Sequence, residues 1–321
     1  MQVKASDRAA AAEHRAPPRH PARGPRAAAP RRWSRKVQGL GYAAPTAVFV
    51  AVFFLLPLLL VGQMSLSDWP LLAGDLGRNA PENYTDVTDS TLFWPAVRFT
   101  LLYTAIVTVV LLGLALLLAL LVQESRPGAG FFRTVYFLPG ALGLASASLL
   151  FWGLYSPTTG PLSRPLEKLG LADGPVSFLS TPTSALLSTV FLVVWKFAGF
   201  YMLILLVGLQ RIPHEVYEAA RMDGAGRGQI FRRITLPLLR PSLALSLLLC
   251  VTGSLLAFDQ FFVLTKGGPD NSTVTVVQLI YREAFQRMNL GTAAALSILV
   301  LGALLLLNVL QFLGLRRADE S

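Results

Sequence analysis

The chain has 321 residues, of which 53% are hydrophobic and only 14% are charged, and its mean hydropathy is positive. A soluble domain of this length carries more charge to cover its surface, so the composition favours a membrane protein. The formal net charge of +10 does not indicate a nucleic-acid partner, because the basic residues flank hydrophobic stretches rather than gather on one folded face.

Residues 1–38 form a basic arm that is rich in alanine, proline and arginine. The arm has too few apolar side chains to fold alone, so we expect it to be disordered, with its charge directing topology and contacting anionic membrane lipid. Arg31-Arg32 superficially resembles a twin-arginine signal. However, the apolar stretch that follows is longer than a usual signal core and lacks Ala-x-Ala cleavage chemistry, so we expect a retained first span.

Six segments reach the roughly 20 apolar residues that are needed to cross a bilayer core. They lie at 40–61, 99–122, 134–155, 185–209, 243–264 and 292–315. The predicted fold class is therefore all-α, a polytopic membrane protein with six transmembrane helices in a domain at 39–315 and a short tail at 316–321. Pro139-Gly140 predicts a kink in the third span, either as a hinge or as a packing bend.

The orientation of the spans follows from the distribution of Lys and Arg. Six crossings place both termini on one side, together with the second and fourth connections. This side holds 20 of the 28 basic residues, the opposite side holds seven, and Lys196 lies within a span. We therefore predict a multi-pass protein of the bacterial inner membrane with both termini in the cytoplasm.

The three connections on the outer side are of different kinds. Residues 65–96 are acidic, with Trp69 and Trp94 placed as interfacial anchors. Residues 156–184 are rich in proline and glycine and predict an irregular loop. Residues 265–290 begin with Lys266-Gly267-Gly268-Pro269-Asp270, which is a turn signal rather than a phosphate loop, because GxxxxGK[ST] is absent from the chain.

The fourth connection, at 211–237, is the most informative stretch. Pro213 suits the first turn of a helix, with Glu215 and Glu218 early in that helix and favourable near its positive end. Gly224 is predicted to end this helix. A second short helix is expected at 227–235, with Pro237 stopping it.

Small and acidic residues make this loop a candidate docking surface. Four small residues give a low-relief face, and three larger apolar residues surround it: Ala219, Ala220, Gly224, Ala225, then Tyr217, Ile230 and Phe231. The alternative is an amphipathic linker that lies on the lipid surface. A lipid-bound helix would carry a broad apolar face, whereas this one shows small residues flanked by acids, so we favour docking to another protein.

The loop also resembles a known family. Glu218-Ala219-Ala220-x-x-Asp223-Gly224-Ala225 and then Ile234-x-Leu236-Pro237 are similar to the EAA loop in permease subunits of ATP-binding-cassette (ABC) importers. Other landmarks agree in order over residues 40–315: Asn83-Tyr84, Phe137-Leu138-Pro139, Gly208-Leu209-Gln210-x-Ile212-Pro213, Phe258-Asp259-Gln260, Thr265-x-Gly267-Gly268-Pro269 and Gly291-x-Ala293-Ala294-Ala295. Together they resemble the carbohydrate-uptake group, and the Gly-Gly-Pro loop resembles its first permease, the maltose- and glycerol-phosphate-type A subunit.

The resemblance implies a set of partners and a docking site. The partners are a cytoplasmic ABC ATPase dimer, a second homologous permease and an extracytoplasmic solute-binding protein. ATP and Mg²⁺ would bind to the ATPase, and this chain would bind no cofactor and catalyse no reaction. Docking is implied for Tyr217, Glu218, Ala219, Ala220, Asp223, Gly224, Ala225, Ile234, Leu236 and Pro237, with Glu218 as the ion-pair partner.

Polar and aromatic residues inside the spans are candidates for the cargo path: Trp195, Lys196, Tyr201, Asp259 and Gln260. A charge in hydrocarbon is costly and normally faces a cavity or a partner. Lys196 and Asp259 could therefore contact cargo, or could form structural pairs or reach an interface. The aromatic residues could stack on sugar rings or could simply pack.

Other classes of function fit the sequence less well. An ion-driven transporter would need intramembrane carboxylates, and only Asp259 offers one. A single cysteine, Cys250, excludes an internal disulfide and a multi-cysteine metal site, and no polar catalytic cluster is present for a membrane enzyme. Within importers, a non-sugar solute such as a phosphorylated polyol is the alternative cargo.

Overall fold

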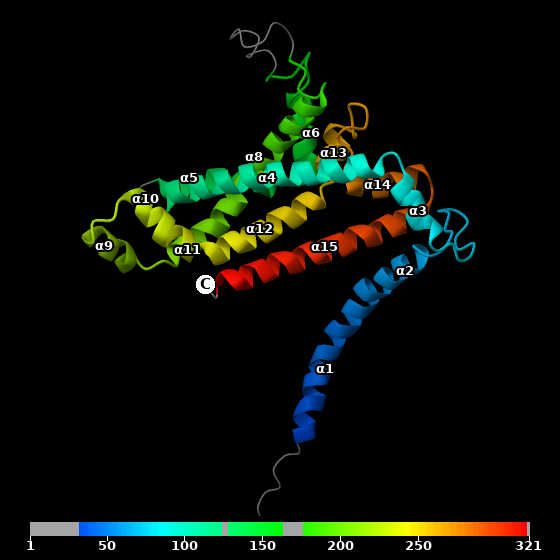
Figure 1. The fold of residues 1–321 in the computed structure, drawn as a ribbon, viewed down its shortest axis with the longest axis horizontal. Coiled ribbons are helices and arrows are strands. Elements are labelled where there is room, and N and C mark those ends of the chain that lie inside the picture. Colours follow the sequence, from blue (N-terminus) through cyan, green and yellow to red (C-terminus); the bar gives the residue numbers. More distant parts are fainter. Residues whose placement is uncertain (1–31, 124–127, 163–175, 320–321) are drawn as a thin grey trace, which may run out of the picture. The chain divides into compact units, whose positions relative to one another are not determined.

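The computed structural model describes residues 32–123, 128–162 and 176–319 of the chain. These ranges are built from helices and short connections (Figure 1), and within them β-structure is limited to the isolated bridges Ser67–Arg78 and Pro70–Asn289. The predicted all-α fold class is confirmed. The predictions for the arm at 1–31, for the end of the tail and for residues 163–175 of the outer-side loop at 156–184 fall outside the described residues.

The chain divides into two compact units, Met1–Leu56 and Pro57–Ser321. The first unit contains helix α1 (Arg32–Val50) and a π-helical turn, η1 (Ala51–Leu55). Helix α1 begins before residue 38, where the predicted arm ends, so the last part of that arm is helical. The apolar stretch Tyr42–Met64, which runs on through α2 (Leu56–Met64), is long enough to cross a membrane.

The second unit contains the remaining long helices. Together with Tyr42–Met64, the described part of the chain has five helical stretches that are long and apolar enough to cross a membrane, or up to six if one bent pair is counted as a span. The long helices of this unit are α4 (Phe93–Val122), α8 (Pro182–Gln210), α12 (Arg240–Leu255) and α15 (Leu290–Asp319).

The third predicted span is not a continuous helix. It consists of α5 (Ala129–Phe137), the short 3₁₀ helix η2 (Leu138–Ala141) and α6 (Leu144–Leu154), with a bend of 95° between the halves. Pro139 lies in η2 and has no N–H to donate, and the chain after η2 is extended at Leu142 and Gly143. The predicted kink is therefore a complete break.

The fifth predicted span is also interrupted. Helix α12 ends at Leu255, and α13 (Asp259–Leu264) begins after three non-helical residues. Asp259 therefore lies in the first turn of a short helix rather than inside a long one. The negative charge is favourable there because it lies near the positive end of the helix.

Helix α8 is the central helix of this unit. Within its apolar window 61% of the residues are buried, compared with 22–33% for the windows of α4, α12 and α15. It packs along α4, where Tyr103, Val107 and Leu111 meet Met202 and Leu205 in one apolar core. A helix buried on most sides can transmit a displacement from one end of a bundle to the other.

The end of the unit that carries α3 (Glu82–Asp89) is held by hydrogen bonds between distant segments. The Asn83 side-chain amide donates to the carbonyl oxygens of Ser65 (3.1 Å) and Ser67 (2.9 Å). The Leu290 amide donates to the Trp69 carbonyl (2.8 Å), which ties the same connection to the start of α15. Asn83, one of the sequence landmarks, therefore has a structural role.

Two further elements lie between α13 and α15. They are α14 (Val276–Tyr281) and the π-helical turn η4 (Arg282–Gln286). Figure 1 shows α3 and α14 at one end of the unit and the helices of the 211–237 loop at the opposite end. The sequence predicted only a turn in this connection, because α14 is too short to show a clear helical period.

Helices α5 and α8 approach each other closely at Gly199. A Cβ atom on Gly199 would lie 2.0 Å from the carbonyl oxygen of Tyr136 and 2.4 Å from its carbonyl carbon. Both are backbone atoms that cannot rotate away. The contact therefore requires glycine at this position.

We predict that Gly199→Ala lowers the free energy of unfolding by about 1–3 kcal/mol, because overpacking forces the two helices apart. Thermal melting in detergent measures the change. Gly113→Ala is the matched control, since Gly113 is also helical but a Cβ atom added there would have no neighbour within 4 Å. Equal melting temperatures for the two variants would contradict this packing.

Candidate functional site

The 211–237 loop begins with helix α9 (His214–Met222), for which Pro213 is the N-cap rather than a first-turn residue. The helix ends in a left-handed turn at Gly224, where φ is +78°. The amides of Gly224 and Ala225 donate to the carbonyls of Arg221 (3.0 Å) and Ala220 (2.9 Å). Glycine is favoured at such a helix end because it adopts positive φ without a steric cost.

The second part of the loop is a continuous helical run through Pro237. It contains α10 (Arg227–Ile230), the π-helical turn η3 (Phe231–Thr235) and α11 (Leu236–Leu238). The prediction that Pro237 stops the helix was wrong. The π turn changes the hydrogen-bond register just before the proline, which has no N–H, so the chain stays helical.

The structure divides the predicted docking residues into an exposed set and an inward set. Exposed side chains or backbone occur at Glu218, Ala219, Asp223 and Gly224. Buried or half-buried positions are Tyr217, Ala220, Ala225, Ile234, Leu236 and Pro237. The exposed set covers one turn of α9 and the glycine corner, so it forms a continuous surface.

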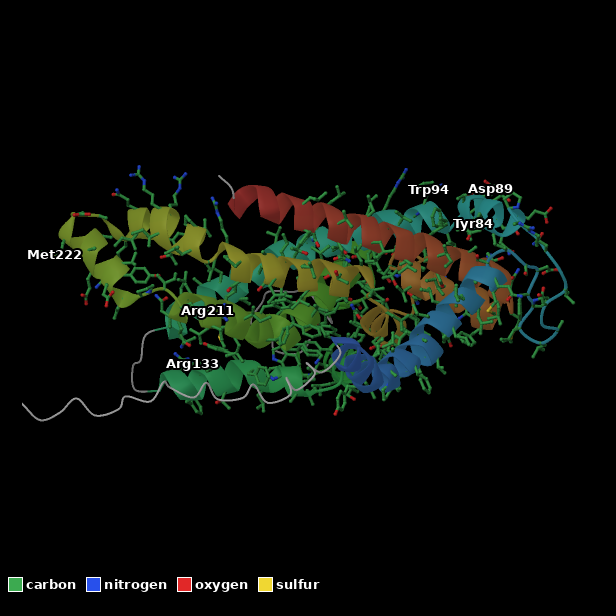
Figure 2. All side chains as sticks on the ribbon, turned by 90° about the horizontal axis from the view of Figure 1, so that it is seen from below. Tyr84, Asp89, Trp94, Arg133, Arg211 and Met222 are labelled. Atoms are coloured by element: carbon green, nitrogen blue, oxygen red, sulfur yellow. The ribbon has the colours of Figure 1, made fainter. Side chains whose placement is uncertain are left out.

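Tyr217 joins the two halves of the loop. Its hydroxyl lies 3.4 Å from the Thr235 hydroxyl, and its ring packs against the core of the unit. Tyr217, predicted as one of the larger apolar residues around the docking face, is therefore half-buried between the loop and the core. Met222, which was not among the predicted docking residues, is 88% exposed at the tip of the loop (Figure 2).

Lys196 holds the break in the third span. Its side-chain nitrogen donates to the carbonyl oxygens of Gly140 (3.3 Å) and Leu142, and it is 4% exposed. It also lies 4.9 Å from the centre of the Phe197 ring. Three interpretations were left open for Lys196: cargo contact, a structural pair and reaching an interface. The geometry supports a structural role, in which the partners are backbone carbonyls.

A central cavity of about 200 Å³ lies between α4, α8, α12 and α13. It brings together three of the predicted cargo residues, Tyr201, Asp259 and Gln260. Trp195 and Lys196 are not among the lining residues; Trp195 packs on Phe151 at 5.1 Å between ring centres. The predicted cargo set is therefore divided between a cavity wall and helix packing.

Gln260 has the most informative environment in this cavity. Its side chain is 3% exposed, and its amide nitrogen donates to the Tyr103 hydroxyl at 3.0 Å. The Gln260 side-chain oxygen has no hydrogen-bond partner among the described residues. An unpaired buried acceptor costs about 1–3 kcal/mol, so a hydroxyl donor in the cavity would offset that cost.

Sequence reasoning did not find Tyr103 or Ser254, which also line the cavity. Tyr103 lies in an uninterrupted apolar span, and Ser254 lies one residue before a helix end that no proline marks. A tyrosine within an apolar stretch is a weak signal for a binding site, because most such residues are packed in a core.

The long apolar helices, the cavity between interrupted helices and the exposed loop define a multi-pass membrane protein built for transport. A family model described as a binding-protein-dependent transport system inner membrane component matches residues 111–319. The match covers well over half of the chain. This chain therefore belongs to that family of transport-system membrane components.

Individual relatives agree with this assignment. A probable ABC transporter permease of Bacillus subtilis is 31% identical over 282 residues, which cover 87% of this chain and 96% of the relative. The trehalose/maltose transport system permease of Thermococcus litoralis is 34% identical over 265 residues, which cover 81% and 88%. A crystal structure of a bacterial ABC transporter involved in alginate import matches with a TM-score of 0.79 and 25% identity, over 89% of this chain and 98% of that one. The chain is a permease-type, non-catalytic subunit.

We predict that Lys196→Met loosens the helix break, because two carbonyl oxygens lose a buried donor at a cost of about 1–3 kcal/mol. Hydrogen–deuterium exchange of residues 138–144 should become faster, while exchange in α9 stays the same. Trp195→Phe is the control, because that side chain packs on Phe151 rather than on the break. Unchanged exchange at 138–144 in Lys196→Met would show that the amine does not hold the break.

Proposed function

We propose that this chain is one permease half of an ATP-driven, binding-protein-dependent sugar importer. The observation that carries the proposal is the exposed corner of the 211–237 loop, where Glu218, Asp223 and Gly224 face solvent just beyond the end of α8, the helix that leads from the cavity. Sugar as the cargo class is supported by the relatives, whose names specify trehalose/maltose and alginate.

The loop end of the second unit is the cytoplasmic end in this proposal. Arg133 and Arg211 lie toward the same end as Met222, and Tyr84, Asp89 and Trp94 lie at the other end (Figure 2). Cationic residues concentrate on the cytoplasmic side of membrane proteins. With this orientation both termini are cytoplasmic, in the inner membrane of a bacterium.

The exposed loop corner docks a cytoplasmic ATPase. Glu218 supplies a charge for an ion pair, and Ala219 with Gly224 lets the partner approach the backbone closely. ATP and Mg²⁺ bind to the ATPase dimer and not to this chain. A second, homologous permease completes the pore, and an extracytoplasmic binding protein delivers the sugar to the end that carries α3 and α14.

The central cavity is the part of the cargo path that this chain contributes. Asp259 and the unpaired oxygen of Gln260 accept hydrogen bonds from sugar hydroxyls, and Tyr201 provides an aromatic wall. A phosphorylated polyol is less favoured as the cargo. The cavity has an acidic side chain in its wall, and Lys196, the nearest candidate cation, is bonded to backbone carbonyls instead.

The experiment that tests this function uses the complete transporter, reconstituted in lipid vesicles with its cognate binding protein. A ligand screen of the binding protein first identifies the sugar that it retains. ATPase activity should then rise when binding protein loaded with that sugar is added to the outside. An ATPase activity that does not change when the loaded binding protein is added would exclude an importer of this class.

We predict that Gly224→Asp abolishes uptake and association with the ATPase, while insertion into the membrane is unchanged. Aspartate tolerates positive φ better than most residues, so the loss would come from a charged side chain placed on the docking surface. Pull-down of the ATPase and vesicle uptake measure the two effects.

Gly74→Asp is the matched control for this change. Gly74 has almost the same backbone conformation (φ +77°) and equally open space around its Cβ position, and it belongs to the connection at the opposite end of the unit. Normal ATPase binding by Gly224→Asp would refute docking at this corner. A loss of ATPase binding in both variants would point to general misfolding instead.

We predict that Gln260→Leu lowers uptake about tenfold at sub-saturating sugar, because a hydrogen bond to a sugar hydroxyl is worth about 1–1.5 kcal/mol. Initial rates of uptake are compared at a fixed amount of loaded binding protein. Basal ATPase activity should stay unchanged, because the loop is not altered. A wild-type rate of uptake in this variant would show that Gln260 does not contact the sugar.

A further inference from the structure

A second and larger cavity, of about 560 Å³, lies at the opposite end of the second unit from the loop. Its walls come from α6, from α13 with the turn that follows it, and from α14 with η4. The volume is in the range of small-molecule sites. None of the residues that line this cavity belongs to the set predicted from sequence.

Aromatic rings connect this second cavity to the central one. Phe258 lines the central cavity, and its ring stacks on Phe262 with 5.0 Å between ring centres. Phe262 in turn meets Tyr281 at 4.9 Å, and both line the second cavity, where Trp152 forms another wall. These contacts form an unbroken row of rings from the lining of one cavity to the lining of the other. Exposed aromatic faces of this kind can stack on the apolar faces of sugar rings.

A buried amide also points to a ligand. Gln278 lines the second cavity and is 2% exposed, yet its side-chain oxygen has no hydrogen-bond partner among the described residues. Buried acceptors are normally satisfied, and an orphan calls for an explanation such as a bound group. Gln260 has the same unpaired oxygen in the central cavity.

Two cationic side chains complete the wall. The Arg282 guanidinium donates to the Asn271 side-chain oxygen (2.7 Å) and to the Lys266 carbonyl (3.1 Å), so its position is fixed. Lys266 lines the same cavity, and the described lining contains no acidic residue. The cavity therefore offers one fixed donor group on Arg282, the exposed amine of Lys266, one unpaired acceptor and aromatic faces.

We propose that this cavity is a receiving subsite that holds one pyranose ring of a neutral oligosaccharide before the sugar reaches the central cavity. The ring stacks on Trp152 and Tyr281, one hydroxyl donates to the Gln278 side-chain oxygen, and other hydroxyls accept from Lys266 and Arg282. The inference rests on the proposed import function, because this cavity would be the first binding site along the same import path.

A neutral sugar suits the order in which the cargo would meet the two cavities better than an acidic sugar does. The cations of the second cavity would attract a carboxylate, but Asp259 lines the next cavity along the aromatic path. A carboxylate entering that cavity would meet a like charge in a region of low dielectric constant, which is unfavourable. Hydroxyl groups can accept from the cations and donate to Asp259 in turn.

The test uses the complete transporter in lipid nanodiscs, without the binding protein, and maltotriose as the probe. The reporter is the fluorescence of Trp152 in a variant in which the other four tryptophans are replaced by phenylalanine. We expect a saturable change with half-saturation at about 1–10 mM, the affinity of a weak transient site. No change in Trp152 fluorescence would overturn the subsite.

A matched reporter checks that the response is local. Trp94 and Trp152 are both 55% exposed, but Trp94 lines a separate apolar groove, so the single-Trp94 variant should not respond to maltotriose. An equal response of Trp94 would overturn the assignment. In a separate titration, sugar-free binding protein is added instead of maltotriose. A response of Trp152 to the binding protein but not to maltotriose would identify a protein-docking surface and would also overturn the subsite.

Two substitutions test the named contacts. Gln278→Leu should raise the half-saturating concentration about tenfold, and Lys266→Gln, at an exposed position, about threefold. Gln311→Leu is the control, since it removes another unpaired side-chain oxygen, on α15 and away from both cavities, and should leave the Trp152 titration unchanged. Unaltered titrations in both test variants would contradict the proposed contacts.

Two further arms separate this proposal from the proposed function. Trigalacturonate replaces maltotriose in one titration, and binding at least tenfold tighter than maltotriose would overturn the neutral preference. The ATPase assay with loaded binding protein runs on the same preparation. If maltotriose does not change Trp152 fluorescence but loaded binding protein stimulates the ATPase, the subsite alone is rejected. If loaded binding protein does not stimulate the ATPase, the importer function itself is rejected.

Discussion

Backbone hydrogen bonding at the two helix breaks is the constraint on which the rest of this structure depends. Inside a bilayer no water is available for a free carbonyl, so a break survives only where a neighbouring group replaces the lost partner. Lys196 does so for the break around Gly140, and the Thr275 hydroxyl donates to the Ala257 carbonyl (2.8 Å) at the other break. Both donors come from a different helix or connection.

The breaks produce the central cavity and place it beside α8. Leu144, just after the first break, and residues 256–258 of the second break all line the cavity. Helix α8 carries Lys196 and Tyr201 against this region and ends at Gln210, immediately before the loop. A buried, uninterrupted helix thus links the central cavity to the 211–237 loop, which is the connection that the proposed coupling to an ATPase requires.

Particular residues show where sequence reasoning succeeded and where it did not. Gly224 was predicted as a helix end because positive φ is a local property of glycine, and the structure has that turn. Pro237 misled the prediction, because a π turn upstream, which no local pattern indicates, keeps the chain helical. Asp259 was placed inside a span, since the break before it contains neither glycine nor proline.

The sequence by itself determined that long apolar segments alternate with polar connections, how Lys and Arg are distributed among those connections, and the composition of the 211–237 loop. These properties follow from side-chain chemistry along one stretch of chain. Only the tertiary structure decided that Lys196 serves a helix break, that Gln260 bonds Tyr103, and that Gln278 lines a second cavity. Those contacts join residues 54 to 157 positions apart or lie between separate helices, so they depend on packing, which no local pattern encodes.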